Sequence, residues 1–232
     1  MRILAIAAHP DDLEFSCGGI LLTEAARGAE IFLCLCSRGE SGSNGTPDER
    51  EAEARAATKI IGAEITFLDF GGDSHLEYAN RHALALARQI RVVRPEIVLG
   101  SVTSANQHPD HAVVGHLVDD AARFARYGGI EELRDLPAHA VQHHLRYAVT
   151  PGATPRDRQG LRVDISGQFE RWIELMECHR SQLRTRNYLE LQTARARLAG
   201  VEAGVEYAQA LFANDDLLVR QLAEIPPSVR LF

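Results

Sequence analysis

The strongest constraint on the fold of this chain is a regular alternation of apolar segments of strand length with segments of helical periodicity. The apolar segments are residues 2–8, 30–36, 64–70 and 95–101. The helices are expected at residues 17–27, 48–62, 80–94 and 110–126, the second beginning at a capping Asp48 and ending at Gly62. Strands that alternate with helices pair in parallel, so this pattern predicts an α/β fold, a Rossmann-like three-layer sandwich with a mostly parallel sheet.

The rest of the chain is less regular. We expect strands at residues 143–150 and 162–166, a loop at 151–160, helices at 168–186 and 188–213, and an extended tail after Ile225. The tail is predicted because two adjacent prolines prevent a helix from continuing. No repeat, low-complexity tract or long linker divides the sequence, so residues 1–232 are predicted to form a single domain.

Charge and composition exclude several classes of partner. The net charge is −7, with 32 acidic against 25 basic residues, whereas proteins that bind nucleic acids or anionic membranes present a basic face. The N-terminal apolar run is too short for a signal peptide or a membrane span. The four cysteines form no C-x-x-C pair and are expected to be buried free thiols. The sequence therefore predicts a cytoplasmic protein with a small-molecule partner.

Ionisable side chains are concentrated after the first and fourth predicted strands. The first motif is "HPDD" and the second is "HPDH", and together they contribute His9, Asp11, Asp12, His108, Asp110 and His111. In the Rossmann-type strand order 3-2-1-4-5-6 these two strands are neighbours, and both following loops open into the same crevice. We therefore expect the active site at the carboxyl ends of strands 1 and 4.

Such a concentration of ionisable groups is costly to bury unless a cation pairs with it. Two imidazoles with one carboxylate form a known catalytic zinc set, which also suits iron(II). A spare carboxylate beside the ligands can then accept a proton from water. Taken singly, each motif is also compatible with a helix start, in which proline occupies the first turn and an aspartate caps free N–H groups.

Two other enzyme classes are not supported. The first turn lacks the G-x-G-x-x-G pattern of dinucleotide-binding folds, because Gly18 and Gly19 come too late. No G-x-S-x-G elbow follows a strand, which argues against a serine hydrolase.

Four segments together resemble the PIG-L/LmbE family of metal-dependent N-deacetylases, which act on molecules that contain N-acetylglucosamine. The segments are "AAHPDDLEFSCGG", "SRGESGSNGTPDEREAEARAA", "RPEIVLG" and "HPDHAVVG". Two later segments, "CHRSQL" (178–183) and "GVEYAQALF" (204–212), are most similar to the branch that includes the bacillithiol-pathway deacetylases, which act on N-acetylglucosaminyl malate. The resemblance implies a zinc-dependent deacetylase that forms homo-oligomers, in some relatives hexamers.

The resemblance also implies a role for each motif residue. His9, Asp12 and His111 would bind zinc, with iron(II) as the alternative in the cell, and Asp11 would be the general base. His108 would stabilise the oxyanion, and Asp110 would orient His108 by a hydrogen bond. The proton for the leaving amine would come from His108 or from Asp11.

Residues outside the two motifs complete the predicted site. Arg50 would hold the sugar or its aglycone, and Glu40 and Asp73 would bind sugar hydroxyls. His179 and Ser181 are expected to make structural hydrogen bonds near the site. The competing readings are hydrolysis of another acyl amide or of a phosphoester at the same metal, and a non-catalytic sugar-binding module.

Overall fold

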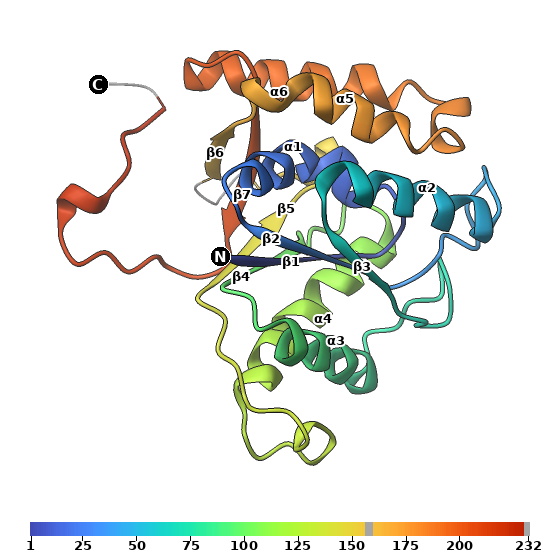
Figure 1. Ribbon diagram of the computed structural model, residues 1–232, viewed down its shortest axis with the longest axis vertical. Coiled ribbons are helices and arrows are strands. Elements are labelled where there is room, and N and C mark those ends of the chain that lie inside the picture. The colour runs from blue at the N-terminus through green and yellow to red at the C-terminus, as the bar shows by residue number, and fades with distance from the viewer. Residues whose placement is uncertain (156–159, 230–232) are drawn as a thin grey trace.

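The computed structural model describes residues 1–155 and 160–229 and contains one seven-stranded sheet (Figure 1). The strands are β1 (Arg2–Ala7), β2 (Glu30–Leu35), β3 (Glu64–Phe67), β4 (Ile97–Ser101), β5 (His143–Tyr147), β6 (Gly160–Asp164) and β7 (Ala208–Ala213). Their order is β3-β2-β1-β4-β5-β7-β6. The first five are parallel, and β7 runs antiparallel to both β5 and β6.

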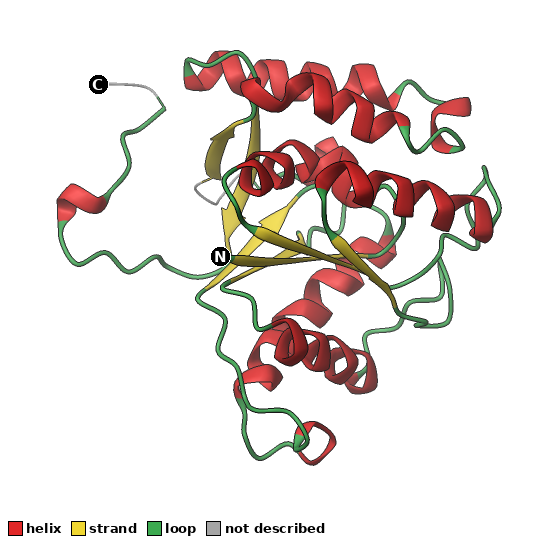
Figure 2. Ribbon diagram, viewed as in Figure 1, coloured by secondary structure: helices red, strands yellow, loops and turns green. Residues whose placement is uncertain are grey.

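Helices cover both faces of this sheet (Figure 2). They are α1 (Asp12–Ala26), α2 (Pro47–Ile61), α3 (Asn80–Val93), α4 (Pro109–Arg126), α5 (Phe169–Glu177) and α6 (Tyr188–Ala203). The helices α1, α2, α5 and α6 share one hydrophobic cluster with the sheet, whereas α3 and α4 share a second cluster on the opposite face. The predicted three-layer α/β sandwich with a mostly parallel sheet is confirmed.

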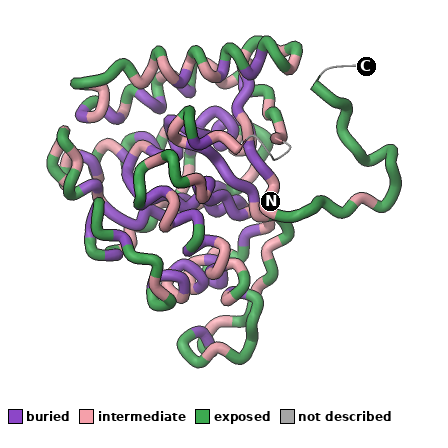
Figure 3. The backbone as a smooth tube through the Cα atoms, turned by 180° about the vertical axis from the view of Figure 1, so that it is seen from behind, coloured by how far each residue is buried: buried purple, intermediate pink, exposed green. Residues whose placement is uncertain are grey.

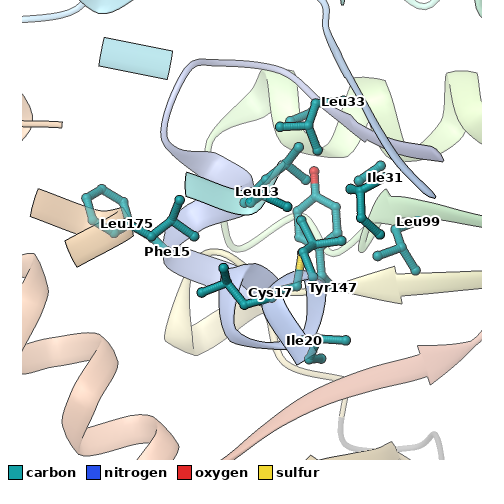
Figure 4. Packing of buried hydrophobic residues seen from close by; sticks show 14 of the residues in the cluster. Leu13, Phe15, Cys17, Ile20, Ile31, Leu33, Leu99, Tyr147 and Leu175 are labelled. Carbon is teal, nitrogen blue, oxygen red and sulfur yellow. The ribbon is translucent and has the colours of Figure 1, made fainter. Parts of the chain in front are cut away.

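The central strands read as continuous apolar runs because both of their faces are buried (Figure 3). Along β1, Ile3 and Ala5 face one cluster, while Leu4 and Ile6 face the other. Figure 4 shows the first cluster, where Leu13 and other side chains of α1 pack against side chains of the strands. The buried hydroxyl of Tyr147 is satisfied by donating to the Ile6 carbonyl oxygen at 2.7 Å.

The predicted start of the first helix is wrong, because α1 begins at Asp12 rather than at residue 17. The glycine pair Gly18 and Gly19 weakens the helical signal, but here it permits close packing between helices. A Cβ atom on Gly18 would lie 2.8 Å from Leu175 Cδ2 of α5. The cap of α2 is also corrected: Thr46, not Asp48, accepts the Glu49 N–H, and Pro47 opens the helix.

The C-terminal part differs most from the prediction. The expected helix at 188–213 ends at Ala203, Gly204 adopts a left-handed conformation, and residues 208–213 form β7 instead. Pairing with β5 and β6 outweighs the helical pattern there. The expected helix at 168–186 stops at Glu177. Residues 156–159 of the predicted loop and 230–232 of the predicted tail lie outside the described residues.

The described residues contain no helix that is both long and apolar enough to cross a membrane. All four cysteines are free thiols. Cys17, Cys34 and Cys36 are buried as expected, whereas Cys178 is only half-buried.

Candidate active site

The first motif follows the carboxyl end of β1, where Asp11 adopts an unusual backbone conformation. Its φ is 100°, in the left-handed region, and its side chain makes no capping hydrogen bond to α1. Non-glycine residues enter this region at a cost and are concentrated at functional sites. The carboxylate of Asp11 is thus held away from the capping role that an aspartate in this position would normally have.

Three buried side chains, one imidazole and one carboxylate from the first motif and one imidazole from the second, form a small triangle of metal-donor groups, here called the donor triangle. His9 Nδ1 lies 3.3 Å from His111 Nε2, His111 Nε2 lies 3.0 Å from Asp12 Oδ1, and His9 Nδ1 lies 3.6 Å from Asp12 Oδ2. Ligands about 2.0–2.2 Å from a tetrahedral metal ion are separated by about 3.4 Å. The spacing and the chemistry of this triangle therefore fit a divalent cation, and these residues are one of the groups that could hold one.

The opposite nitrogen of His9 faces two carboxylates. His9 Nε2 lies 3.1 Å from Asp110 Oδ2 and 3.2 Å from Asp73 Oδ1. Asp110 also accepts the Ser74 N–H at 2.6 Å. If a cation took the place of the Nδ1 proton, His9 would keep its Nε2 proton on these carboxylates and direct the Nδ1 lone pair into the donor triangle, an arrangement in which carboxylates fix the tautomer of a metal-binding histidine.

These contacts also set the protonation of the group. Burial lowers the pKa of His9, but hydrogen bonds to Asp110, Asp12 and Asp73 outweigh burial and raise it well above the usual value. Burial raises the pKa of Asp12, but His111 and His9 outweigh it and hold that pKa well below normal. The Asp12 carboxylate is therefore ionised, as a metal ligand must be.

Asp11 lies between Asp12 and a buried arginine. Its Oδ1 is 3.7 Å from Arg50 Nη2, and Arg50 Nη1 is 3.7 Å from Asp73 Oδ2. Burial, followed by the charge of Asp12, raises the pKa of Asp11 to about 7, whereas Arg50 opposes this shift. A carboxyl group that titrates near neutral pH is suited to accept and return a proton.

Arg50 itself is only 4% exposed. It donates to the carbonyl oxygens of Gly39 at 3.1 Å and Pro10 at 2.9 Å. Gly39 has a φ of 75°, and a Cβ atom there would lie 2.1 Å from Arg50 Nη1. The loop before α2 thus wraps around the guanidinium, which lies 3.7 Å from the carboxylates of Asp11 and Asp73. The predicted contact of Arg50 with the sugar or its aglycone stays a prediction.

His108 is the exposed imidazole of the group, with a side chain 40% exposed. Its Nδ1 accepts the Asp110 N–H at 3.3 Å, which leaves the proton on Nε2, 4.0 Å from Asp73 Oδ1. Burial lowers the pKa of His108, and His9 and His111 lower it further. His108 therefore presents a neutral N–H donor. The orienting bond from Asp110 comes from its backbone N–H, since its carboxylate contacts His9.

The two acids predicted to bind sugar hydroxyls lie in the surrounding loops. Asp73 is 6% exposed and contacts His9, whereas Glu40 is exposed and accepts the N–H groups of Arg38 and Asp73 at 3.0 and 2.8 Å. Both residues connect loops around the site, and their predicted contacts with a sugar stay predictions.

Sequence reasoning missed several supporting residues. Ser74 has no motif signal, and its role depends on a left-handed φ of 66°. Glu14 is buried, with Oε1 3.4 Å from Nε2 of the fully buried His179. Glu53 accepts both the N–H and the hydroxyl of Ser181 at 2.7 and 2.6 Å. These pairs join α1 and α2 to the segment after α5, a contact over more than a hundred residues that no local pattern reveals.

In the metal-free protein, Asp11→Asn is expected to raise the melting temperature at pH 8. The folded protein holds the Asp11 pKa near 7, above the ordinary 3.8, so ionising this buried carboxyl group destabilises the fold progressively as pH rises from about 4 to about 7. This destabilisation amounts to at most about 4 kcal/mol, which corresponds to several degrees in melting temperature. Thermal unfolding of both proteins in chelator at pH 4.5 and pH 8 measures it, with the exposed Asp216→Asn as control. An Asn variant that melts no higher than the parent at pH 8 would contradict this charge assignment.

Comparison with known proteins places these residues in a family. The family model described as "PIG-L: GlcNAc-PI de-N-acetylase" matches residues 4–122, a segment that contains both motifs.

Three curated relatives illustrate the range of names among similar proteins. The uncharacterized deacetylase YaiS of Escherichia coli is 32% identical over 48% of this chain and 63% of its own length. The 4-oxalmesaconate hydratase of Pseudomonas putida is 27% identical over 61% of this chain and 60% of its own length. The 1D-myo-inositol 2-acetamido-2-deoxy-alpha-D-glucopyranoside deacetylase of Corynebacterium efficiens is 27% identical over 79% of this chain and 72% of its own length. The chain thus spans less than two thirds of the first two relatives.

A solved structure agrees over nearly the whole chain. The conserved protein TT1542 from Thermus thermophilus superposes with a TM-score of 0.83 at 31% identity, covering 94% of this chain and 96% of that protein.

Proposed function

The chain belongs to the PIG-L family, and from that premise we propose that it is a metal-dependent hydrolase that removes the N-acetyl group from a small molecule containing N-acetylglucosamine. The observation that carries the proposal is the donor triangle of His9, Asp12 and His111, which has a separate carboxyl group, Asp11, and a separate N–H donor, His108, beside it. The name of the Corynebacterium efficiens relative, a deacetylase of an acetamido sugar, supports the substrate class.

The finer assignment is part of the same proposal. The metal is zinc, with iron(II) as the alternative in the cell, because two imidazoles and a carboxylate suit both. The substrate is N-acetylglucosaminyl malate, for which the support is the resemblance of residues 178–183 and 204–212 to the bacillithiol branch. The resemblance to the family is the reason to propose a homo-oligomer, and the free thiols are the reason to propose a cytoplasmic location.

Each group then has a defined task in the reaction. His9, Asp12 and His111 hold the cation, which when bound supplies Lewis acidity that acidifies water and polarises the acyl oxygen. Asp11 takes the proton from the attacking water. The Nε2–H of His108 donates to the oxyanion that forms on the acyl group. The leaving nitrogen then receives the proton that Asp11 took from the water, because the neutral His108 has no proton that it can readily release.

Two buried carboxylates and one arginine keep these groups in place. Asp110 and Asp73 fix the tautomer of His9 through its Nε2. Arg50 limits the rise in the pKa of Asp11, so that this carboxyl group is available as a base near neutral pH.

Family membership alone does not choose the reaction, since the Pseudomonas putida relative is named a hydratase. A hydratase adds water to a carbon–carbon double bond and releases neither acetate nor amine. The decisive experiment therefore measures primary amine released from N-acetylglucosamine and from N-acetylglucosaminyl malate by zinc-loaded protein, with and without a chelator.

We expect amine release that the chelator abolishes, with the malate conjugate as the faster substrate. Equal rates on both sugars would contradict the malate assignment and leave the deacetylase intact. Absence of amine release from both would overturn the deacetylation of these sugars and favour hydrolysis of another acyl amide, and binding of either sugar without turnover would favour a sugar-binding module.

A further inference from the structure

A cavity of about 260 Å³ lies between α1, α6 and the antiparallel strands β6 and β7, which are adjacent in Figure 1. None of the nine predicted site residues lines it. Its polar lining includes Ser16, Gln192, Arg195 and Gln209, and much of the remaining wall is alanine. Pockets for drug-sized ligands begin at about 300 Å³, so an occupant of this cavity is small.

Arg195 lines this cavity with N–H groups that the described residues leave without an acceptor. Its Nη1 donates to the Val149 carbonyl oxygen at 2.8 Å and to Gln192 Oε1 at 2.7 Å, and its Nη2 donates to the Ala148 carbonyl oxygen at 3.2 Å. All three acceptors are neutral. A guanidinium has five N–H groups, and no acceptor within the described residues is recorded for Nε–H or for the second N–H of Nη2.

Arg195 is half-buried, and the fully buried Arg91 shows that carbonyl oxygens alone can satisfy a guanidinium in this fold. Arg91 on α3 donates to five backbone carbonyl oxygens, so that each of its N–H groups has an acceptor. Arg195 has three acceptors and borders a cavity. Arg195 thus differs from Arg91, because two of its N–H groups have no acceptor among the described residues.

The charge balance of the cavity is also positive. Among the described residues, the other charged groups that line the cavity are Arg162 and Glu202, which pair with each other at 3.4 Å. Burial lowers the pKa of Arg195, with no carboxylate among the causes. A desolvated cation without a counter-charge is unfavourable, and an anion that entered the cavity would relieve that cost.

We propose that this cavity binds a small organic carboxylate, whose two oxygens accept from Nε and Nη2 of Arg195. Adjacent nitrogens of a guanidinium match the two oxygens of a carboxylate. The amide side chains of Gln192 and Gln209 border the polar end, and the alanines Ala196, Ala199 and Ala208 give room for a short carbon chain. A carboxylate with such a chain is favoured over inorganic phosphate because the alanine wall offers phosphate no partners.

Butyrate is a suitable probe, and its binding to the full chain is followed by isothermal titration and by ligand-observed NMR. We expect Arg195→Gln to weaken butyrate binding at least tenfold. Ala199→Met, which fills the cavity and leaves the guanidinium in place, is expected to weaken it similarly and keeps the test available if the arginine variant does not fold. The neutral butyramide and inorganic phosphate are each expected to bind at least tenfold more weakly than butyrate.

Two controls separate this cavity from other sites. Arg81→Gln removes one exposed arginine on the opposite face of the sheet and is expected to leave butyrate binding unchanged. His111→Ala disrupts the donor triangle and is also expected to leave it unchanged, so this test is independent of the deacetylase proposal. Equal binding by Arg195→Gln and the parent, equal binding of butyramide or phosphate, or loss of binding in His111→Ala would each overturn the carboxylate site.

Discussion

Asp11→Asn is expected to lower the rate of amine release by about 10²–10⁴-fold while the protein keeps its metal. The substitution preserves the size of the side chain but removes the ability to accept a proton. It does not alter the donor triangle, because Asp11 contributes no atom to the group of His9, Asp12 and His111. The measurements are turnover at saturating substrate and metal content by mass spectrometry on the same preparation.

The control for this variant is Asp216→Asn, a change at an exposed aspartate that follows β7. It is expected to match the parent in both measurements. A metal-loaded Asp11→Asn protein as fast as the parent would remove Asp11 from the reaction. Loss of metal together with activity would instead mean that Asp11 serves the cation, and the base would have to be sought elsewhere.

The same substitution is expected to act in opposite directions on stability and on turnover. Burial raises the pKa of Asp11 to about 7, so the ionised form that would serve as a base is also the form that the metal-free site accommodates poorly. A cation bound by the donor triangle would offset this penalty. Strain and charge that weaken the fold are commonly found at catalytic groups, and Asp11 combines a left-handed φ of 100° with a raised pKa.

The sequence was sufficient for the sheet order around β1 and for the meeting of the two motifs. Both inferences depend on local periodicity and on a general property of parallel sheets, namely that neighbouring carboxyl ends share one edge. The same local reasoning failed at residues 208–213. These residues are apolar enough for a buried helix, and only their pairing with β5 and β6 makes them a strand.

The orientation of the site residues was beyond the sequence for a different reason. "HPDH" places Asp110 beside His108, yet the carboxylate contacts His9, which lies 101 residues away in the chain. Arg50 likewise contacts residues that are distant in the chain, since Asp11 and Pro10 belong to the first motif. The residues that a helical side chain contacts depend on where the helix lies on the sheet, and sequence spacing alone does not give that position.

His111→Ala is expected to remove the metal, with an affinity loss of more than about 100-fold. Changes to residues that only support a metal ligand cost about 10–100-fold, and His111 contributes one of the three donor atoms itself. Competition with a chromogenic chelator measures the affinity. A second readout is independent of activity: a cation that binds only the folded protein raises its melting temperature, so zinc should stabilise the parent and leave His111→Ala unchanged. His116→Ala, five residues further along α4 and exposed, is the matched control and should behave like the parent.

Equal zinc affinity in His111→Ala and the parent would move the metal to the other side of His9, where Asp73, His108 and Asp110 form the alternative group. In that case Asp110→Asn, rather than His111→Ala, would abolish the stabilisation by zinc, so the two variants together decide which nitrogen of His9 faces the cation.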